Sequence, residues 1–215
     1  NPLSSILGIE SILNPVVQNN TNLPVEIPKF LGLIFKSANN GIKVIEDIQD
    51  AYSFEQKGVS IEIESLALEE MLSEIKNNFQ QKLEQKKIRL ITVCPEGLRL
   101  KTNRLRLTRA IENALTNAIK FTPENKDIEI NVHTKDYIDI TIKDSGIGIP
   151  KKLHRYLFQK FTQAKRRGLQ NEVSTGLGMY IIHKIMTSLG GAVTIDSIEN
   201  RGTSISLLLP LSKIE

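Results

Sequence analysis

The chain has 215 residues, of which 40% are apolar and 24% charged, as in an ordinary globular protein with one large domain or two small ones. The sequence contains no run of about eighteen apolar residues, the length that a membrane-spanning helix needs. The single cysteine, Cys94, excludes a disulfide framework and fits a reducing compartment. Net charge is +4, much of it in residues 151–167, where a solvated, phosphate-facing segment is favoured over a nucleic-acid site.

The opening residues, NPLSSILG, lack the basic leader and cleavage site of a signal peptide. They read as the interior of a helix, so the chain is expected to be a fragment. The expected location is cytoplasmic, and contact with a membrane is expected only through other parts of a parent protein, which could be anchored in the inner membrane.

Apolar residues at helical spacing predict a first helix over residues 1–17, followed by a polar stretch at 14–24. From about residue 28 a second helix carries a heptad seam, formed by Leu31, Ile34, Ala38, Gly41, Ile45, Ile48 and Tyr52. Two helices cannot bury such a seam alone, so we expect an antiparallel hairpin over residues 1–57 that pairs with a second copy in a four-helix bundle. Packing of the seam against the rest of its own chain is the alternative.

After a glycine-containing turn at residues 56–58 the pattern changes. Alternating or apolar runs predict strands at 59–65, 88–93, 127–133, 137–144, 192–197 and 203–210. Helical periodicity predicts helices at about 68–83, 103–121, 151–160 and 177–189. Long helices combined with mostly hairpin-linked strands indicate an α+β fold, a two-layer α/β sandwich over residues 58–215.

The predicted helix at 103–121 carries an unusual polar stripe. Asn113, Asn117 and Lys120 are spaced by four and three residues, so they share one face, while the apolar residues of the helix occupy another. Amide oxygens suit a hard cation such as Mg²⁺, and a lysine suits a phosphate. A solvated helix face explains this stripe equally well when it is taken alone.

Three glycine-bearing stretches follow the stripe. The strand at 137–144 ends at Asp144, which could accept a hydrogen bond from an exocyclic amine such as that of adenine, and it runs into DSGIGIP, with Gly146 and Gly148. In STGLGMYI, Gly176 and Gly178 open a helix whose N-terminus could receive a phosphate. RGTSISLLLP enters the last strand. Neither a Walker motif nor a dinucleotide-binding GxGxxG occurs, so a nucleotide would be held in another way.

The ordered set NALTNAIKFT, DSGIGIP, LFQKFTQ, STGLGMYI and RGTSISLLLP resembles the N, G1, F, G2 and G3 boxes of sensor histidine kinases. These kinases belong to the ATP-binding superfamily shared with gyrase, Hsp90 and MutL. The resemblance covers roughly residues 60–211, and the hairpin before it resembles the dimerisation and phosphotransfer domain of the family, with NPLSSILG like the tail of its H box.

This resemblance implies roles for particular residues. Asn117, helped by Asn113, would hold Mg²⁺, Lys120 would contact phosphate, and Asp144 would read the adenine amine. The 161–176 segment would form a mobile lid over ATP. The nucleotide pocket would be shaped by Gly146, Gly148, Ile149, Phe161, Thr175, Gly176, Leu177, Gly178 and Thr203.

The residue at position 113 indicates whether hydrolysis or phosphoryl transfer is expected. In hydrolysing relatives a glutamate at this position activates water, whereas Asn113 cannot act as a base, and Glu112 points about 100° away around the helix. Transfer of the γ-phosphoryl to a protein nucleophile therefore fits better than hydrolysis. The resemblance places the acceptor histidine just upstream of Asn1, so this chain is expected to lack its own acceptor, and His133, His154 and His183 are poor substitutes.

Two further departures from the family pattern concern residues around the site. Asn103 replaces a frequent aspartate and should still cap the following helix. The long insert AKRRGLQNEV leaves the order of the lid open.

The sequence thus predicts the core of a dimeric two-component histidine kinase, with residues 58–215 as its catalytic domain and an aspartate of a response-regulator receiver domain as the onward phosphoryl acceptor. Two alternatives remain: a catalytically inactive, ATP-sensing dimeric regulatory module, and a nucleic-acid binder that uses residues 151–167.

Overall fold

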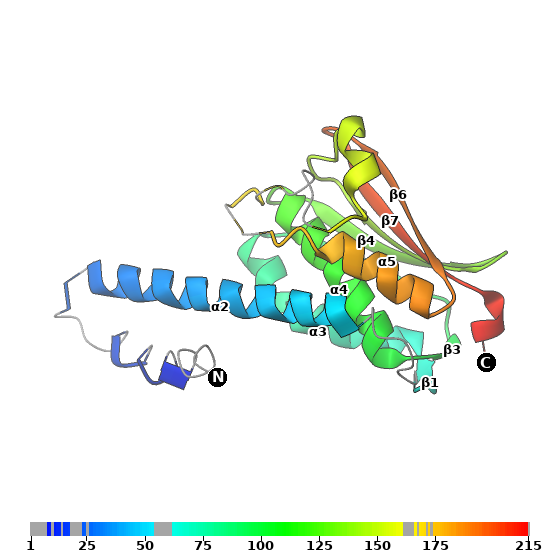
Figure 1. Ribbon diagram of the computed structural model, residues 1–215, viewed down its shortest axis with the longest axis horizontal. Coiled ribbons are helices and arrows are strands. Elements are labelled where there is room, and N and C mark those ends of the chain that lie inside the picture. Colours follow the sequence, from blue (N-terminus) through cyan, green and yellow to red (C-terminus); the bar gives the residue numbers. More distant parts are fainter. Residues whose placement is uncertain are drawn as a thin grey trace. The chain divides into compact units, whose positions relative to one another are not determined.

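A computed structural model describes residues 8–9, 11–13, 15–17, 23–24, 26–53, 62–160, 166, 168–170, 172 and 174–214 (Figure 1). Residues 1–50 and 51–215 form two compact units. The predicted boundary between residues 57 and 58 lies outside the described residues. No helix in the described part of the chain combines the length and apolarity needed to cross a membrane.

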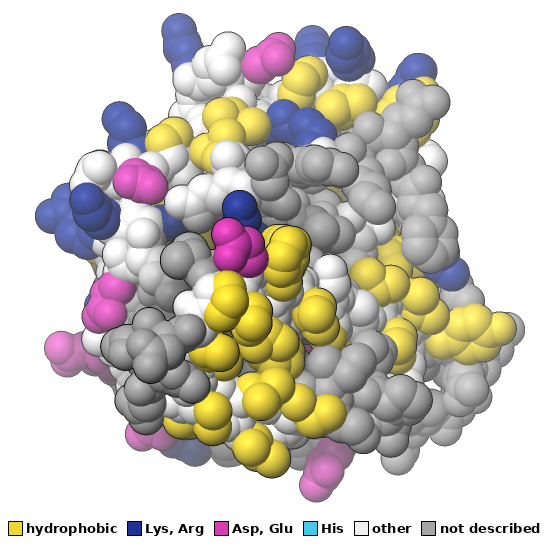
Figure 2. Space-filling view, turned by 90° about the vertical axis from the view of Figure 1, so that its left-hand side faces the viewer, with side chains coloured by type: hydrophobic (Ala, Val, Ile, Leu, Met, Phe, Trp, Pro, Cys, Tyr) yellow, Lys and Arg dark blue, Asp and Glu magenta, His cyan; other side chains and the backbone are white. Residues whose placement is uncertain are grey.

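The first unit is described mainly through helix α2, Glu26–Ser53, which begins slightly before the predicted start at residue 28. Several seam residues are exposed to solvent: Ile34 at 54%, Ile45 at 41%, Ile48 at 42% and Tyr52 at 67%. Figure 2 shows hydrophobic side chains, in yellow, near the middle of the face that it draws. The predicted first helix falls partly outside the described residues, so the hairpin stays a prediction.

The second unit is built on a five-stranded sheet with the order β2-β4-β5-β7-β6. Its strands are β2 (Arg89–Val93), β4 (Asp127–Thr134), β5 (Ile138–Asp144), β6 (Ala192–Ile198) and β7 (Gly202–Leu209). All neighbours are antiparallel except β2 and β4, which run parallel. A separate two-stranded sheet pairs β1 (Glu64–Ala67) with β3 (Arg99–Thr102).

Helices α3 (Leu68–Gln85), α4 (Arg104–Phe121) and α5 (Gly178–Ser188) form the second layer, on one side of the sheet (Figure 1). Strand alternation explains this arrangement, because Ile130 and Ile140 are buried while Asn131 and Thr141, next to them, are only half-buried. The core joins one sheet face to the apolar stripes of the three helices. The predicted α+β two-layer sandwich is therefore confirmed for this unit.

Two predicted elements differ from the structure, and one strand of the structure is not among the predicted elements. Of the strand expected at 59–65, residues 62 and 63 lie outside any strand, and β1 begins at Glu64 and continues to Ala67. The helix expected at 151–160 is a short 3₁₀ helix, Lys151–Tyr156, followed by turns. Strand β3 was not predicted at all, because RLKT alternates over too few residues to stand out.

Candidate functional site

The polar stripe of α4 is partly withdrawn from solvent. Asn113 is 7% exposed, and Asn117 and Lys120 are half-buried. The amide nitrogen of Asn113 donates to the backbone oxygen of Arg109 at 2.8 Å. That bond holds the amide in place and leaves its oxygen, Oδ1, available as an acceptor.

The start of α5 lies against these two amides. A Cβ atom at Gly178 would lie 3.4 Å from Asn113 Oδ1 and 3.7 Å from Asn117 Nδ2. Glycine therefore keeps the space between the two helices open at the point where the stripe meets the positive N-terminus of α5. Gly176, two residues earlier, has a positive φ of 78°, a conformation that suits glycine.

The structure also shows the contacts of Thr175 and Leu177, two other predicted residues of this loop. The hydroxyl of Thr175 accepts a hydrogen bond from the Leu177 amide at 3.3 Å. The side chain of Leu177 is 1% exposed and belongs to the hydrophobic core. The side chain of Leu177 therefore packs into the core rather than toward a ligand.

Asp144 ends the central strand β5 as a buried carboxylate, 8% exposed. Its Oδ1 atom accepts two backbone hydrogen bonds, from Gly146 at 2.8 Å and from Thr203 at 3.2 Å. Burial raises the pKa of Asp144 to about 6, and the two N–H donors only partly oppose that rise. Within the described residues Oδ2 receives no hydrogen bond, so it is the oxygen left for a donor from outside.

The turn after Asp144 is held between α4 and the β6–β7 hairpin. Ile147 donates to the backbone oxygen of Phe121 at 3.1 Å, and Asn200 donates to that of Ile147 at 2.8 Å. Gly148 has a positive φ of 60°, and a Cβ atom there would collide with the carbonyl of Ile198. The backbone next to Asp144 thus depends on a glycine at position 148.

Ser197 of β6 was missed by the sequence reasoning. Its hydroxyl donates to the Gly202 carbonyl at 3.0 Å, accepts from the Ile149 amide at 2.9 Å and lies 2.9 Å from the Thr203 hydroxyl. The Ser197 side chain thereby contacts two predicted site residues, Ile149 and Thr203, and the neighbouring Gly202. These contacts depend on the register of β6 with β7, which sets Ser197 opposite Thr203, so no signal in the sequence pointed to this residue.

The segment before α5 is described only in part, and Phe161 lies outside the described residues. Arg166 donates to the Gly148 carbonyl at 2.7 Å, and its guanidinium lies 5.1 Å from the centre of the Phe121 ring. The Leu169 amide donates to the Lys120 carbonyl at 3.1 Å. These residues of the expected lid therefore contact the end of α4 and the turn after Asp144.

The contacts shown for the three histidines are with residues other than those of the stripe. His133 is exposed at the end of β4, and His154 contacts the Ile149 carbonyl through Nε2 at 3.0 Å. His183 is exposed on α5, with its ring 5.5 Å from that of Phe158. His154 alone is bonded to a residue of the predicted pocket, and only through a backbone oxygen.

Most of the predicted residues that the structure describes lie beside the C-terminal half of α4 or next to the turn that contacts its end. The two amides meet Gly178, while Phe121, at the end of the same helix, contacts the turn that follows Asp144. Thr203 pairs with Asp144 across β5 and β7. The α4 stripe offers amide oxygens and a lysine, and Asp144 offers a carboxylate oxygen that receives no hydrogen bond from the described residues. Such an arrangement suits a phosphorylated ligand that carries an amine.

Comparison with known proteins identifies the family. The family of histidine kinase-, DNA gyrase B-, and HSP90-like ATPases matches residues 102–213, just over half of the chain. Sensor histidine kinase RcsC of Salmonella typhimurium is 31% identical over 216 residues, which cover 98% of this chain and 22% of RcsC. The chain spans less than a third of the length of the curated relatives it matches.

Two complexes are among the solved structures that share the fold. The crystal structure of full-length ShkA in complex with AMPPNP has a TM-score of 0.73 and 18% identity, over 97% of this chain and 43% of that one. Histidine kinase ThkA in complex with response regulator protein TrrA has a TM-score of 0.69 and 23% identity, over 97% and 58%. The chain therefore belongs to the family of histidine kinase-, DNA gyrase B- and HSP90-like ATPases, and it carries a histidine kinase ATPase core.

Proposed function

We propose that residues 58–215 are the catalytic domain of a two-component sensor histidine kinase, which binds Mg-ATP and transfers its γ-phosphoryl group to a histidine. The observation that carries this proposal is Asp144, whose Oδ1 is saturated by backbone donors and whose Oδ2 is left for an amine donor such as that of adenine. ATP is the ligand class of the family, and ShkA was solved with AMPPNP.

The phosphate end of the nucleotide is assigned to the α4 stripe. The donor set fits Mg²⁺, because Asn113 keeps Oδ1 as an acceptor and the Asn117 amide lies beside it at Gly178. Asn117 and Asn113 would hold the ion, which when bound neutralises charge on the phosphate oxygens. Lys120 and the N-terminus of α5 would contact the phosphates, and the carboxylate of Asp144 would orient the base.

The residue at position 113 of α4 favours phosphoryl transfer over hydrolysis. Asn113 occupies the position facing Gly178 and cannot accept a proton from water. In the proposed reaction a ring nitrogen of histidine forms a bond to the γ-phosphorus, the bond to the β–γ bridging oxygen breaks, ADP leaves, and the ring releases its proton. The protein contributes by positioning the groups and stabilising charge.

The remaining parts of the proposal concern residues 1–57 and the partners. The exposed seam of α2 suits pairing with a second copy in a four-helix bundle that also carries the acceptor histidine. An aspartate of a response-regulator receiver domain would then take the phosphoryl group, as a response regulator is the partner of ThkA in its complex. We place this core in the cytoplasm of the cell.

The test uses γ-labelled ATP with two proteins, the chain as printed and a version in which a segment carrying the proposed acceptor histidine is added before Asn1. Acid-labile label on the extended protein only, lost in Asn117→Ala, is the expected result. Label on the printed chain would assign the acceptor to His133, His154 or His183. Binding of Mg-ATP without label on either protein would support an inactive regulatory module. Salt-sensitive binding of nucleic acid undiminished in Asn117→Ala would contradict the kinase proposal.

A further inference from the structure

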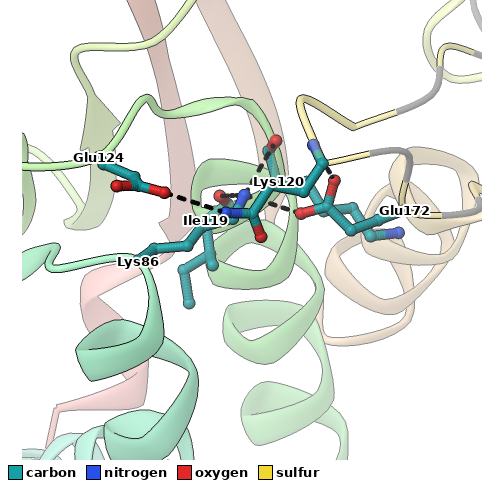
Figure 3. A network of polar contacts seen from close by, with 6 residues as sticks. Lys86, Ile119, Lys120, Glu124 and Glu172 are labelled. Atoms are coloured by element: carbon teal, nitrogen blue, oxygen red, sulfur yellow. Dashed lines mark hydrogen bonds and ion pairs between the residues drawn. The ribbon is translucent and has the colours of Figure 1, made fainter. Parts of the chain in front are cut away.

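Lys86, the residue that follows α3, is a buried lysine outside the predicted site. It is 5% exposed, and its ammonium nitrogen lies 2.8 Å from the Ile119 carbonyl oxygen and 3.4 Å from that of Lys120 (Figure 3). These are carbonyls of the last turn of α4, the end that carries the negative pole of the helix dipole. The third partner is Glu172, whose Oε1 atom is 2.7 Å away.

Glu172 organises the residues around it. Its Oε2 atom accepts from the Gln170 amide at 2.8 Å, and its backbone oxygen accepts from the Gly168 amide at 3.0 Å. Burial tends to raise the pKa of Glu172, but the hydrogen bonds from Lys86 and from backbone amides outweigh it, so the pKa is lowered overall. The carboxylate is therefore ionised and is bonded on both oxygens.

Residues 168–170 and 172, named here the anchor segment, are thus attached to α4 at two points. The Leu169 amide donates to the Lys120 carbonyl at 3.1 Å, and Glu172 pairs with Lys86, which itself bonds to the same carbonyl. Lys120 is the residue whose side chain is assigned to phosphate. The anchor segment is consequently fixed to the backbone of a nucleotide-contacting residue.

We propose that Lys86 is a positioning residue for the nucleotide, which acts by holding the anchor segment against the end of α4. A buried ammonium is costly without a counter-charge, so departure of Glu172 would leave Lys86 with carbonyl oxygens alone. Lys86 therefore resists movement of the anchor segment and reduces the ordering needed when the nucleotide binds. The proposal rests on the proposed function, because it assigns Lys86 to that same site.

The central experiment compares Glu172→Gln with Glu124→Gln. Both variants remove one negative charge near the end of α4, but Glu124 is exposed and contacts the Gln170 side chain at 3.3 Å rather than Lys86. Release of trinitrophenyl-ATP in the presence of Mg²⁺, followed by stopped flow, should be about tenfold faster in Glu172→Gln, the size expected for residues in one network. Glu124→Gln should match the unmodified chain, because the amide oxygen of the new side chain can still accept from Gln170. Equal release from all three proteins would overturn the proposal.

A second measurement separates this proposal from the kinase assignment. Amide hydrogen exchange without nucleotide should be faster at Leu169 and Gln170 in Glu172→Gln, with the rest of the sheet unchanged. This readout holds even if the chain binds no ATP, a result that would remove the proposed function. Unchanged exchange at both amides would overturn the positioning role.

Lys86 itself is tested by a double-mutant cycle. If Lys86→Met folds, adding Glu172→Gln to it should change nucleotide release by less than twofold, because the interaction is already lost. A full tenfold effect in that background would show that Glu172 acts without Lys86. If Lys86→Met does not fold, the comparison of the two glutamate variants decides the question alone.

Discussion

At the scale of single residues, Asp144 carries the clearest physical signature. A carboxylate is buried at the end of the central strand with two donors on one oxygen, and its pKa lies near 6. Ordinary aspartate titrates near 4, so the folded chain holds a proton more tightly than the unfolded chain. Below pH 4 this difference stabilises the fold in full, and the stabilisation is lost as the pH rises through about 6.

Asp144→Asn should therefore be more stable than the unmodified chain at pH 8, by up to about 3 kcal/mol, since a pKa unit corresponds to about 1.4 kcal/mol. The amide oxygen can still accept from Gly146 and Thr203. The advantage should shrink toward pH 4, as urea unfolding followed by circular dichroism would measure. Affinity for Mg-ATP should fall at least a hundredfold, because Nδ2 presents a donor where the base needs an acceptor. A variant that is less stable at pH 8 and retains affinity would contradict this account of the carboxylate.

The residues that sequence reasoning found are those carried by local motifs. Asn113 and Asn117 are four apart on one helix, and Gly146 follows Asp144 by two residues, so their relation can be seen in a short window. Ser197 and Lys86 act on partners that only the fold brings near, 48 residues away for Ile149 and 86 for Glu172. Such contacts leave no periodic trace in the sequence.

At the scale of elements, α4 begins as its sequence predicts. The Asn103 side chain accepts from the Arg106 amide at 2.8 Å, which caps the helix, and its own amide donates to the Glu62 carbonyl at 2.7 Å. The helix that positions the stripe is thereby fixed at its first turn. Helices with long apolar periodicity were located well, whereas the parallel pairing of β2 with β4 depends on distant residues and was not predicted.

Asn103→Ala should lower the free energy of unfolding by about 1 kcal/mol, because the α4 amides lose their capping acceptor. Asn103→Asp keeps that acceptor and adds a negative charge at the helix N-terminus, so it should restore most of the loss. Urea midpoints of the three proteins measure the effect. If the aspartate variant were as unstable as the alanine variant, the bond to Glu62 would be the important one.

At the scale of the whole molecule, the described residues fall into a sheet-containing unit with a buried core and a helical unit in which four of the seven seam residues are exposed, while Ala38 is buried. Periodicity predicts most of the strands and helices whose apolar faces form the core of the sheet-containing unit. The partner of the seam cannot be predicted in the same way. A heptad pattern indicates that a helix face is buried, but it does not identify the surface that buries it. Dimerisation therefore stays a prediction to be measured.

Ile48→Glu tests the seam directly. Glutamate is a good helix former, so α2 should persist, but a charge on the seam should weaken a dimer more than tenfold. Gln49→Glu is the matched control, since it adds the same charge at an exposed neighbouring position. Sedimentation across a range of protein concentrations distinguishes the two variants. Identical association of Ile48→Glu and Gln49→Glu would remove the seam from the dimer interface.

The direction of β5 has a practical consequence. Asp144 ends this strand, so the turn that precedes Ile138 lies at its other end, about 20 Å away for seven residues at roughly 3.3 Å each. Residues 133–137, which comprise the end of β4 and this turn, are all exposed. The chain could be opened there for circular permutation, or could receive an inserted reporter domain, without disturbing the carboxylate. A fluorescent protein inserted at that turn would give a sensor whose recognition end and reporting end are held apart by the length of one strand.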